Sequence, residues 1–335
     1  MTRSKSKLMT LFIVILAILI ITPSSLKAEA IKIQAMRLGS SWYIFGATLS
    51  SLLQENLPKG TTVEVVPKGG GVGNPISVSK EPSKIGLANV ATVVWAWNGH
   101  AVVYKGQQYQ NIRALVGGLN SVWITAMVRE AYIKQTGNDT LEKILLSGKP
   151  VRVVMKPAGS SVPVVADMVL KAMGTSREKI VSNGGKIIQV SAKQIPALIR
   201  DARADLYFES ALKGHPVTTE TSLTGNVRFL DMPDGVLTKL AKEGLNPLPM
   251  PEFFKGQSGP TKALDMGTLL IANESLPDDL AYQITKTLCE NKDAMAAAHK
   301  AWSNFKPEAA WKKENTGIAL HPGAVRYYKE RGWMN

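Results

Sequence analysis

The sequence predicts an α/β protein with mainly parallel β-sheet, organised in two lobes. Strand-like and helix-like stretches alternate after residue 30, which is typical of a parallel sheet covered by helices on both faces. A strand, a Gly-Ser-Ser loop and a helix with regularly spaced apolar residues occur around Gly39 and again around Gly159. This weak repeat indicates two related halves, and 335 residues are enough for two domains.

The first thirty residues have the pattern of a secretory signal peptide. Three basic residues precede an apolar run over 8–21, and residues 28–30 (Ala-Glu-Ala) provide a small-x-small cleavage pattern. We predict cleavage after Ala30 and a periplasmic location. A retained membrane anchor is the alternative, although the apolar run is shorter than the about 20 residues that span a bilayer.

The first half of the remaining chain contains the clearest alternation. We predict strands over 31–38, 61–67 and 84–88 and helices over 42–56 and 91–97. In the first helix, Phe45, Leu49, Leu52 and Leu53 have the spacing of one buried face.

The second half repeats the pattern and then becomes more helical. We predict a strand over 151–155, followed by a helix in which Val165, Met168, Val169 and Ala172 share one face. Residues 245–260 are rich in Pro and Gly and predict a loop. Ser275 and Pro277 predict the start of a helix.

The net charge of +14 favours anionic partners. Nucleic acid is not expected as a partner of an exported chain. The basic residues are dispersed along the sequence, so a generally basic surface is an equally good interpretation. The single cysteine, Cys289, cannot form an internal disulfide and is expected to be buried.

Four loops at strand-to-helix junctions are candidates for ligand binding. Free N–H groups at helix N-termini attract carboxylates and phosphates, glycines allow close approach of a ligand, and serine and asparagine add donors. In open α/β sheets, such loops gather where ligands bind. The candidate ligand-binding residues are Ser40, Ser41, Trp42, Tyr43, Gly71, Asn74, Asn89, Val90, Ser160, Ser161 and Tyr207.

Each of these loops also has a purely structural interpretation. The serines are favoured N-caps, the glycine cluster over 69–73 is also typical of a flexible turn, and the aromatic residues after Ser41 are also typical of a core. Enzyme motifs are absent: there is no P-loop, dinucleotide fingerprint, nucleophile elbow or zinc-binding pattern. We therefore predict a non-enzymatic protein with no catalytic residues, metal or cofactor.

Seven segments together resemble one family. They are 39–46 (GSSWYIFG), 69–74 (GGGVGN), 85–88 (IGLA), 156–161 (KPAGSS), 204–208 (ADLYF), 276–286 (LPDDLAYQITK) and 321–328 (HPGAVRYY). In order and spacing they resemble the TAXI family, the extracytoplasmic solute-binding subunits of tripartite ATP-independent periplasmic (TRAP) transporters.

The resemblance implies a type II periplasmic binding protein fold, with a ligand cleft between two lobes joined by two crossing strands. We expect lobe I over 31–118, lobe II over 119–230 and a return to lobe I over 231–335, with crossings near 115–120 and 227–232. It also implies a ligand such as glutamate, glutamine or a 2-oxo or dicarboxylic acid, and the TRAP membrane permease as partner.

Three departures from the family pattern leave the ligand open. Trp42 takes an aromatic position, Ser83-Lys84 replaces an acidic residue, and Glu209-Ser210 replaces a Gly-Gly pair. Alternatives are a receptor for an ABC importer or a sensor kinase, a periplasmic enzyme on the same scaffold, and an adhesion module with a vestigial pocket.

Overall fold

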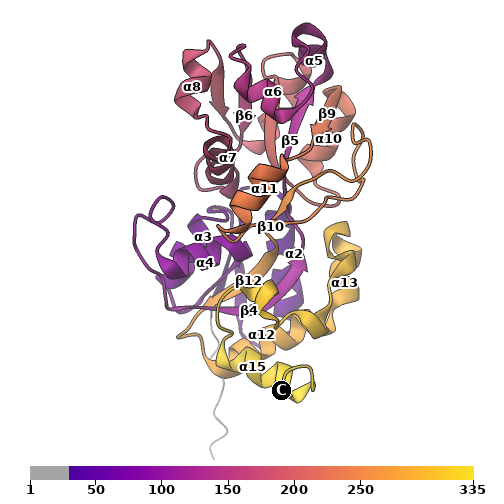
Figure 1. The fold of residues 1–335 in the computed structure, drawn as a ribbon. Helices are drawn as coiled ribbons and strands as arrows, with labels where there is room; N and C mark the ends of the chain where they lie inside the picture. The colour runs from indigo at the N-terminus through magenta and orange to yellow at the C-terminus, as the bar shows by residue number, and fades with distance from the viewer. Residues whose placement is uncertain (1–29) are drawn as a thin grey trace, which may run out of the picture.

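Two β-sheets, one in each lobe, form the framework of the computed structural model (Figure 1). The structure describes residues 30–335. The predicted signal peptide lies in the preceding segment, outside the described residues. The predicted two-lobed α/β fold is confirmed, and the helices cover both faces of the sheets.

Lobe I contains a five-stranded sheet in the order β2-β1-β3-β12-β4. Its strands are β1 (Ala30–Gln34), β2 (Thr62–Val66), β3 (Lys84–Ala88), β4 (Ile112–Asn120) and β12 (Thr268–Asn273). β1 lies between β2 and β3 and runs parallel to both. Its helices are α2 (Ser41–Asn56), α3 (Gly73–Ser79), α4 (Val90–Asn98), α12 (Asp278–Glu290), α13 (Lys292–Ala298), α14 (Lys313–Thr316) and α15 (Pro322–Glu330).

Lobe II contains the second sheet, in the order β10-β11-β5-β8-β6-β7, with β9 paired to β5. Its strands are β5 (Trp123–Arg129), β6 (Arg152–Met155), β7 (Lys186–Gln189), β8 (Leu206–Ala211), β9 (Val227–Leu230), β10 (Asn246–Pro247) and β11 (Leu264–Asp265). β6 runs parallel to β7 and β8, as β1 does to its neighbours. Its helices are α5 (Glu130–Thr136), α6 (Leu141–Leu146), α7 (Ser161–Ala172), α8 (Arg177–Ser182), α9 (Ile195–Arg200), α10 (Pro216–Thr224) and α11 (Asp234–Ala241).

The chain crosses between the lobes twice, at adjacent points. It passes from β4 to β5 through Ser121-Val122 and returns from β11 to β12 through Met266-Gly267. The two crossings are hydrogen-bonded, since Met266 N donates to the carbonyl oxygen of Val122 at 2.9 Å. They form the hinge.

The prediction that the chain returns to lobe I over 227–232 was wrong. β9 occupies this segment and pairs antiparallel with β5 inside the sheet of lobe II, and the chain adds α11, β10 and β11 before it returns. A short apolar strand gives the same sequence pattern in a sheet as in a crossing, so the pattern could not distinguish them.

Regular burial of apolar side chains holds the helices on the sheets. Phe45, Leu49, Leu52 and Leu53 of α2 are all buried, as their spacing predicts. Cys289 of α12 is also buried, as expected.

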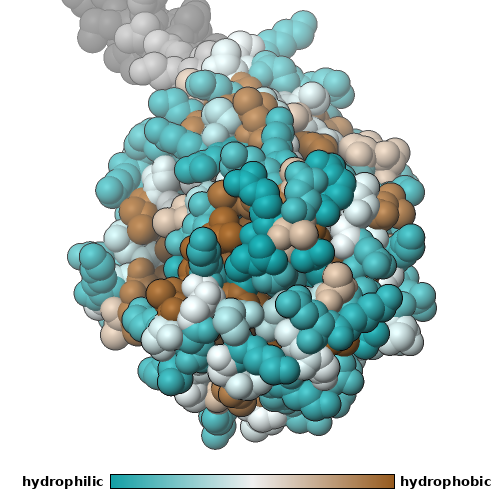
Figure 2. Space-filling model, turned by 90° about the horizontal axis from the view of Figure 1, so that it is seen from above, coloured by the Kyte–Doolittle hydropathy of each residue, from teal (hydrophilic) through white to brown (hydrophobic). Residues whose placement is uncertain are grey.

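The surface of the lobe II end is mostly hydrophilic, with several hydrophobic patches between the polar residues (Figure 2). In the described part of the chain, no helix has the length and apolar character needed to cross a membrane.

Candidate ligand-binding site

Loops of the two lobes meet at the gap between them: the glycine loop over 69–73 of lobe I contacts the Gly-Ser-Ser loop over 159–161 of lobe II, and serines of the Gly-Ser-Ser loop over 39–41 line the same cavity. A Cβ atom placed on Gly70 would lie 2.6 Å from the carbonyl oxygen of Gly159, so loops of the two lobes are in direct contact. They enclose a cavity of about 30 Å³, which we call the serine cavity. Its lining residues are Met36, Ser40, Ser41, Trp42, Gly71, Asn89, Val122, Lys156, Ser160, Ser161, Ser210, Leu212 and His215.

The N-termini of two long helices point into this cavity from opposite lobes. Ser40 caps α2, with its Oγ accepting from Tyr43 N at 3.2 Å, and Ser160 caps α7, with its Oγ accepting from Val162 N at 3.3 Å. These two serines therefore have the capping role considered from the sequence. They also fix both helix N-termini, with their partial positive charges, at the cavity.

Ser41, the first residue of α2, has no such structural partner. Its side chain is 2% exposed, and its Oγ has no hydrogen-bond partner among the described residues. Burying a hydroxyl group without a partner costs about 1–3 kcal/mol. Because this hydroxyl lines the serine cavity, a bound ligand could supply the missing hydrogen bond.

A buried ion pair lies on the lobe II side of the cavity. Lys156 follows β6, and its Nζ contacts Oε1 of Glu209 on the neighbouring strand β8. The same Nζ donates to Ser210 Oγ at 3.0 Å. Glu209 is fully buried, and its Oε2 has no hydrogen-bond partner in the described part of the chain. Lys156 is thus a cation at the cavity whose counter-ion lies directly behind it.

Burial shifts the pKa of Glu209 and that of the neighbouring His215. It raises the pKa of Glu209, an effect opposed by the ammonium of Lys156 and the N–H of Ser210. It also holds the pKa of His215 well below its usual value, together with the charge of Lys156. His215 is therefore neutral at neutral pH, and its Nδ1 accepts from Thr218 N at 3.2 Å as the N-cap of α10.

Asn74 has a structural role in place of the ligand contact expected from the sequence. Its Oδ1 accepts from Gly70 N at 2.8 Å, and its Nδ2 donates to the carbonyl oxygens of Ala35 and Leu87, both at 2.7 Å. The amide is fully buried and its hydrogen-bonding groups are occupied. It shapes the glycine loop and ties the ends of β1 and β3 together.

Three other expected residues do not line the serine cavity. Tyr43 supplies its backbone N–H to the cap of α2. Val90 lines a different cavity at the hinge. Tyr207 is fully buried in the core of lobe II, two residues before Glu209 on the same face of β8. Sequence position near a loop therefore did not determine which side chains reach the cavity.

Sequence reasoning missed the charged and apolar part of the cavity. Lys156, His215, Ser210, Met36, Val122 and Leu212 all line it. The internal repeat could have indicated Lys156. This lysine is three residues before Gly159, as Met36 is three residues before Gly39, so the two side chains have equivalent positions in the two Gly-Ser-Ser loops.

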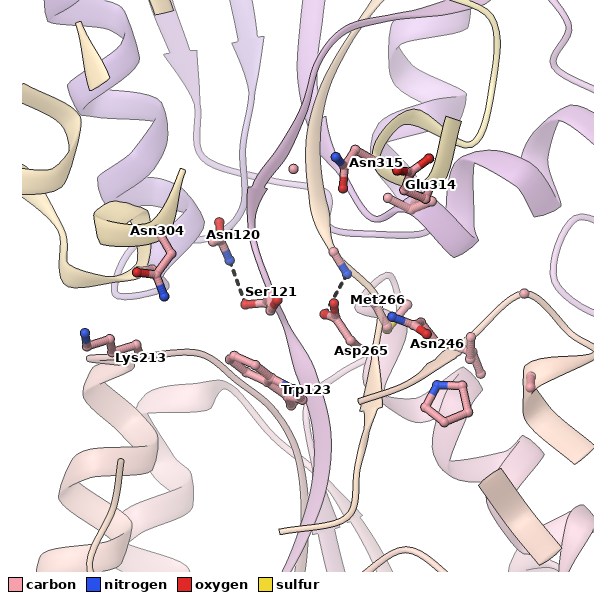
Figure 3. A pocket seen from close by; sticks show the side chains of 18 of the residues that line it. Asn120, Ser121, Trp123, Lys213, Asn246, Asp265, Met266, Asn304, Glu314 and Asn315 are labelled. Atoms are coloured by element: carbon pink, nitrogen blue, oxygen red, sulfur yellow. Dashed lines mark hydrogen bonds between the residues drawn. The ribbon is translucent and has the colours of Figure 1, made fainter. Parts of the chain in front are cut away.

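A second, larger cavity of about 560 Å³ lies at the hinge (Figure 3). Ser121 and Trp123 line it, whereas Val122 lines the serine cavity. Neighbouring residues of the first crossing therefore line different cavities. Asp265 accepts from Val122 N at 2.7 Å and from Gly267 N at 2.9 Å. It therefore holds the two crossing segments together.

The serine cavity is the better candidate for ligand binding. Two helix N-termini capped by serines, one from each lobe, meet there beside the unpaired hydroxyl of Ser41. The hinge cavity is also lined by both lobes and also has buried groups without a partner among the described residues, Asn120 Oδ1 and Trp123 Nε1, but the two capped N-termini do not line it. Among the residues 30–335, no group of three or more His, Cys, Asp or Glu residues could hold a metal ion.

Comparison with solved structures gives the fold. MatC from Rhodopseudomonas palustris, solved with malate, is similar with a TM-score of 0.55 and 11% identity over 92% of this chain and 98% of that chain. Rpa4515 of R. palustris, solved with adipate, is similar with a TM-score of 0.53 and 11% identity over 91% and 94%. A TctC solute-binding protein from Polaromonas has a TM-score of 0.49 and 16% identity over 92% and 98%.

The fold is that of periplasmic solute-binding proteins. In sequence, the NMT1-like family matches residues 33–332, nearly the whole chain described by the structure. With its two lobes and intervening serine cavity, the chain belongs to the NMT1-like family.

Proposed function

We propose that this protein is the extracytoplasmic solute-binding subunit of a TRAP transporter of the TAXI type. It captures a small organic anion in the serine cavity and delivers it to the membrane permease. The observation that carries the proposal is Ser41 Oγ, buried and unpartnered between two helix N-termini from different lobes.

The geometry supports anion capture by closure of the lobes. The caps occupy Tyr43 N and Val162 N, so the N–H groups left for a ligand are those at the very start of each helix, at Ser41 of α2 and Ser161 of α7, which have no intrahelical acceptor. A ligand anion bridging them would hold the lobes together. The cavity of about 30 Å³ in this structure has room for about one water molecule, so the lobes must separate to admit an organic anion and then close around it. Around the bound anion water is largely excluded, which strengthens each hydrogen bond to the ligand. The family resemblance and the shared fold support the transport role.

The first test is mass spectrometry of small molecules released from the purified protein, followed by thermal-shift screening of the acids found. A ligand that binds the folded form alone raises the melting temperature. We expect an organic anion. If neither released compounds nor a broad acid library stabilise the protein, solute binding in this cavity is excluded.

Ser41→Ala tests the site itself. The variant should bind the identified acid roughly tenfold more weakly, because one hydrogen bond is lost, while the ligand-free protein becomes about 1 kcal/mol more stable, because an unpaired buried hydroxyl is removed. Ser51→Ala, at an exposed position of the same helix, is the control and should change neither. Equal affinity of Ser41→Ala and wild type would reject this site.

A gene for a TRAP membrane subunit beside the gene for this chain would support the assigned partner. An adjacent importer ATPase or histidine kinase gene would contradict it.

A further inference from the structure

The serine cavity contains a cation whose charge is already cancelled. Among the residues that line the cavity, Lys156 is the one with a charged side chain at neutral pH. Its ammonium group contacts Glu209, which is buried and therefore not screened by solvent. The side chains around a ligand would therefore contribute a net charge near zero.

The remaining positive potential comes from the helix N-termini. Those of α2 and α7 each correspond to about half an elementary charge, so together they balance roughly one negative charge. α4 adds less, because Val90 N donates to the carbonyl oxygen of Met266 at 2.9 Å, away from the cavity.

Cations outside the cavity do not change this balance. Lys193 lies against Gly39 at the edge of the loop, but it is exposed, and solvent and salt screen exposed charges strongly. A second negative charge on a ligand would thus be buried with no compensating group, which is unfavourable in a closed cavity.

From this balance we infer that the serine cavity selects singly charged organic anions over dianions, and that Glu209 sets this selectivity by neutralising Lys156. The inference rests on the proposed function, and it narrows the ligand class from organic anions to monocarboxylates. The equivalent position in lobe I agrees with it, because Met36 there contributes a neutral thioether.

Isosteric pairs of acids test the inference by calorimetry at pH 8, where carboxylates are ionised. Succinate, glutarate and adipate are each compared with their monoamides, which have the same length and one charge less. We expect the best-bound monoamide to bind roughly tenfold or more tightly than its diacid. Tighter binding of the diacid would overturn the inference but leave the proposed function intact; no binding in either series would count against the proposed function itself.

Two variants move the charge in the predicted direction. Glu209→Gln leaves Lys156 uncompensated, and Met36→Lys adds a cation without touching the ion pair, so it remains informative if Glu209→Gln does not fold. Both should shift the affinity ratio toward the diacid by roughly tenfold. Leu223→Lys adds the same charge at an exposed position on α10 and should leave the ratio unchanged.

The double variant Lys156→Met, Glu209→Gln removes both charges together. It should lose affinity but keep the preference for the monoamide, because the net charge at the cavity stays the same. An unchanged ratio in Met36→Lys, or a preference for the diacid in the double variant, would show that charge balance does not set the selectivity.

Discussion

The two lobes present the same strand, loop and helix to the cavity but fix them in different ways. In lobe I, the neutral amide of Asn74 ties the end of β1 to the end of β3 through backbone carbonyls. In lobe II, the corresponding strands β6 and β8 are tied by the ion pair of Lys156 and Glu209.

The difference shows that the same arrangement of strand, loop and helix has a different role in each lobe. The amide uses all of its hydrogen bonds to shape a loop and contributes no charge to the cavity. The ion pair places an ammonium group at the cavity with its counter-ion behind it. The polar group of lobe I therefore fixes the shape of the cavity, whereas that of lobe II places a charge there together with its counter-ion.

Breaking the ion pair should have the largest effect on stability. Lys156→Met leaves a buried carboxylate without its partner, and we expect the free energy of unfolding to fall by about 3–5 kcal/mol in urea denaturation. The control is Lys143→Met, which removes an exposed pair with Asp139 and should cost less than about 1 kcal/mol. Equal losses in both variants would mean that the buried pair contributes no more than a surface pair.

Removing the amide of lobe I should cost somewhat less. Asn74→Ala removes the acceptor of Gly70 N and the amide that donates to the carbonyl oxygens of Ala35 and Leu87, so we expect the free energy of unfolding to fall by about 2–4 kcal/mol. Ligand affinity should fall as well, because the glycine loop loses its shape. Asn56→Ala, which removes an exposed amide bonded to Leu52, serves as control; a stable Asn74→Ala protein with weakened binding would instead indicate the direct ligand contact predicted from the sequence.

Filling the space between the lobes should affect binding more than folding. A Cβ on Gly71 would lie 2.5 Å from Asn89 Oδ1 and 3.1 Å from Ser161, so Gly71→Ala should weaken ligand binding roughly 10–100-fold in calorimetry. Gly73→Ala is the matched control, because a Cβ placed on Gly73 would meet no neighbouring atom within 4 Å. This variant should bind the ligand as tightly as the wild type. Normal binding by both variants would show that the ligand lies elsewhere.

Titration of His215 in lobe II should have the smallest effect on the free energy of unfolding. The pKa of His215 is lowered below its usual 6.5, so the unfolded chain takes up a proton that the folded chain does not. Neutral His215 therefore favours the folded protein above pH 6.5. As the pH falls from 6.5 toward the lower pKa of the folded state, protonation of the unfolded chain reduces the free energy of unfolding. His215→Asn, which keeps a favoured N-cap, should reduce the slope of unfolding free energy against pH by about 1.4 kcal/mol per unit. An unchanged slope would mean that His215 is protonated in the folded protein.

Features determined by local pattern could be predicted from the sequence. The alternating elements, the buried face of α2 and the position of the serine loops at strand ends all depend on neighbouring residues. Ser41 and Ser161 line the cavity for this reason.

Features that depend on pairing between distant residues could not be predicted. Glu209 contacts Lys156 because β8 lies beside β6. The hydrogen bonds of Asn74 reach three separate parts of the backbone, which the fold alone brings together. The return crossing was misplaced for the same reason, since β9 is defined by its pairing with β5.

A crystal structure of the protein with the acid it releases would show which cavity holds the ligand. We predict one anionic group within hydrogen-bond distance of Ser41 Oγ, between the N-termini of α2 and α7. Ligand density in the hinge cavity, which Trp123 lines, with the serine cavity empty, would show that the serine cavity is not the binding site.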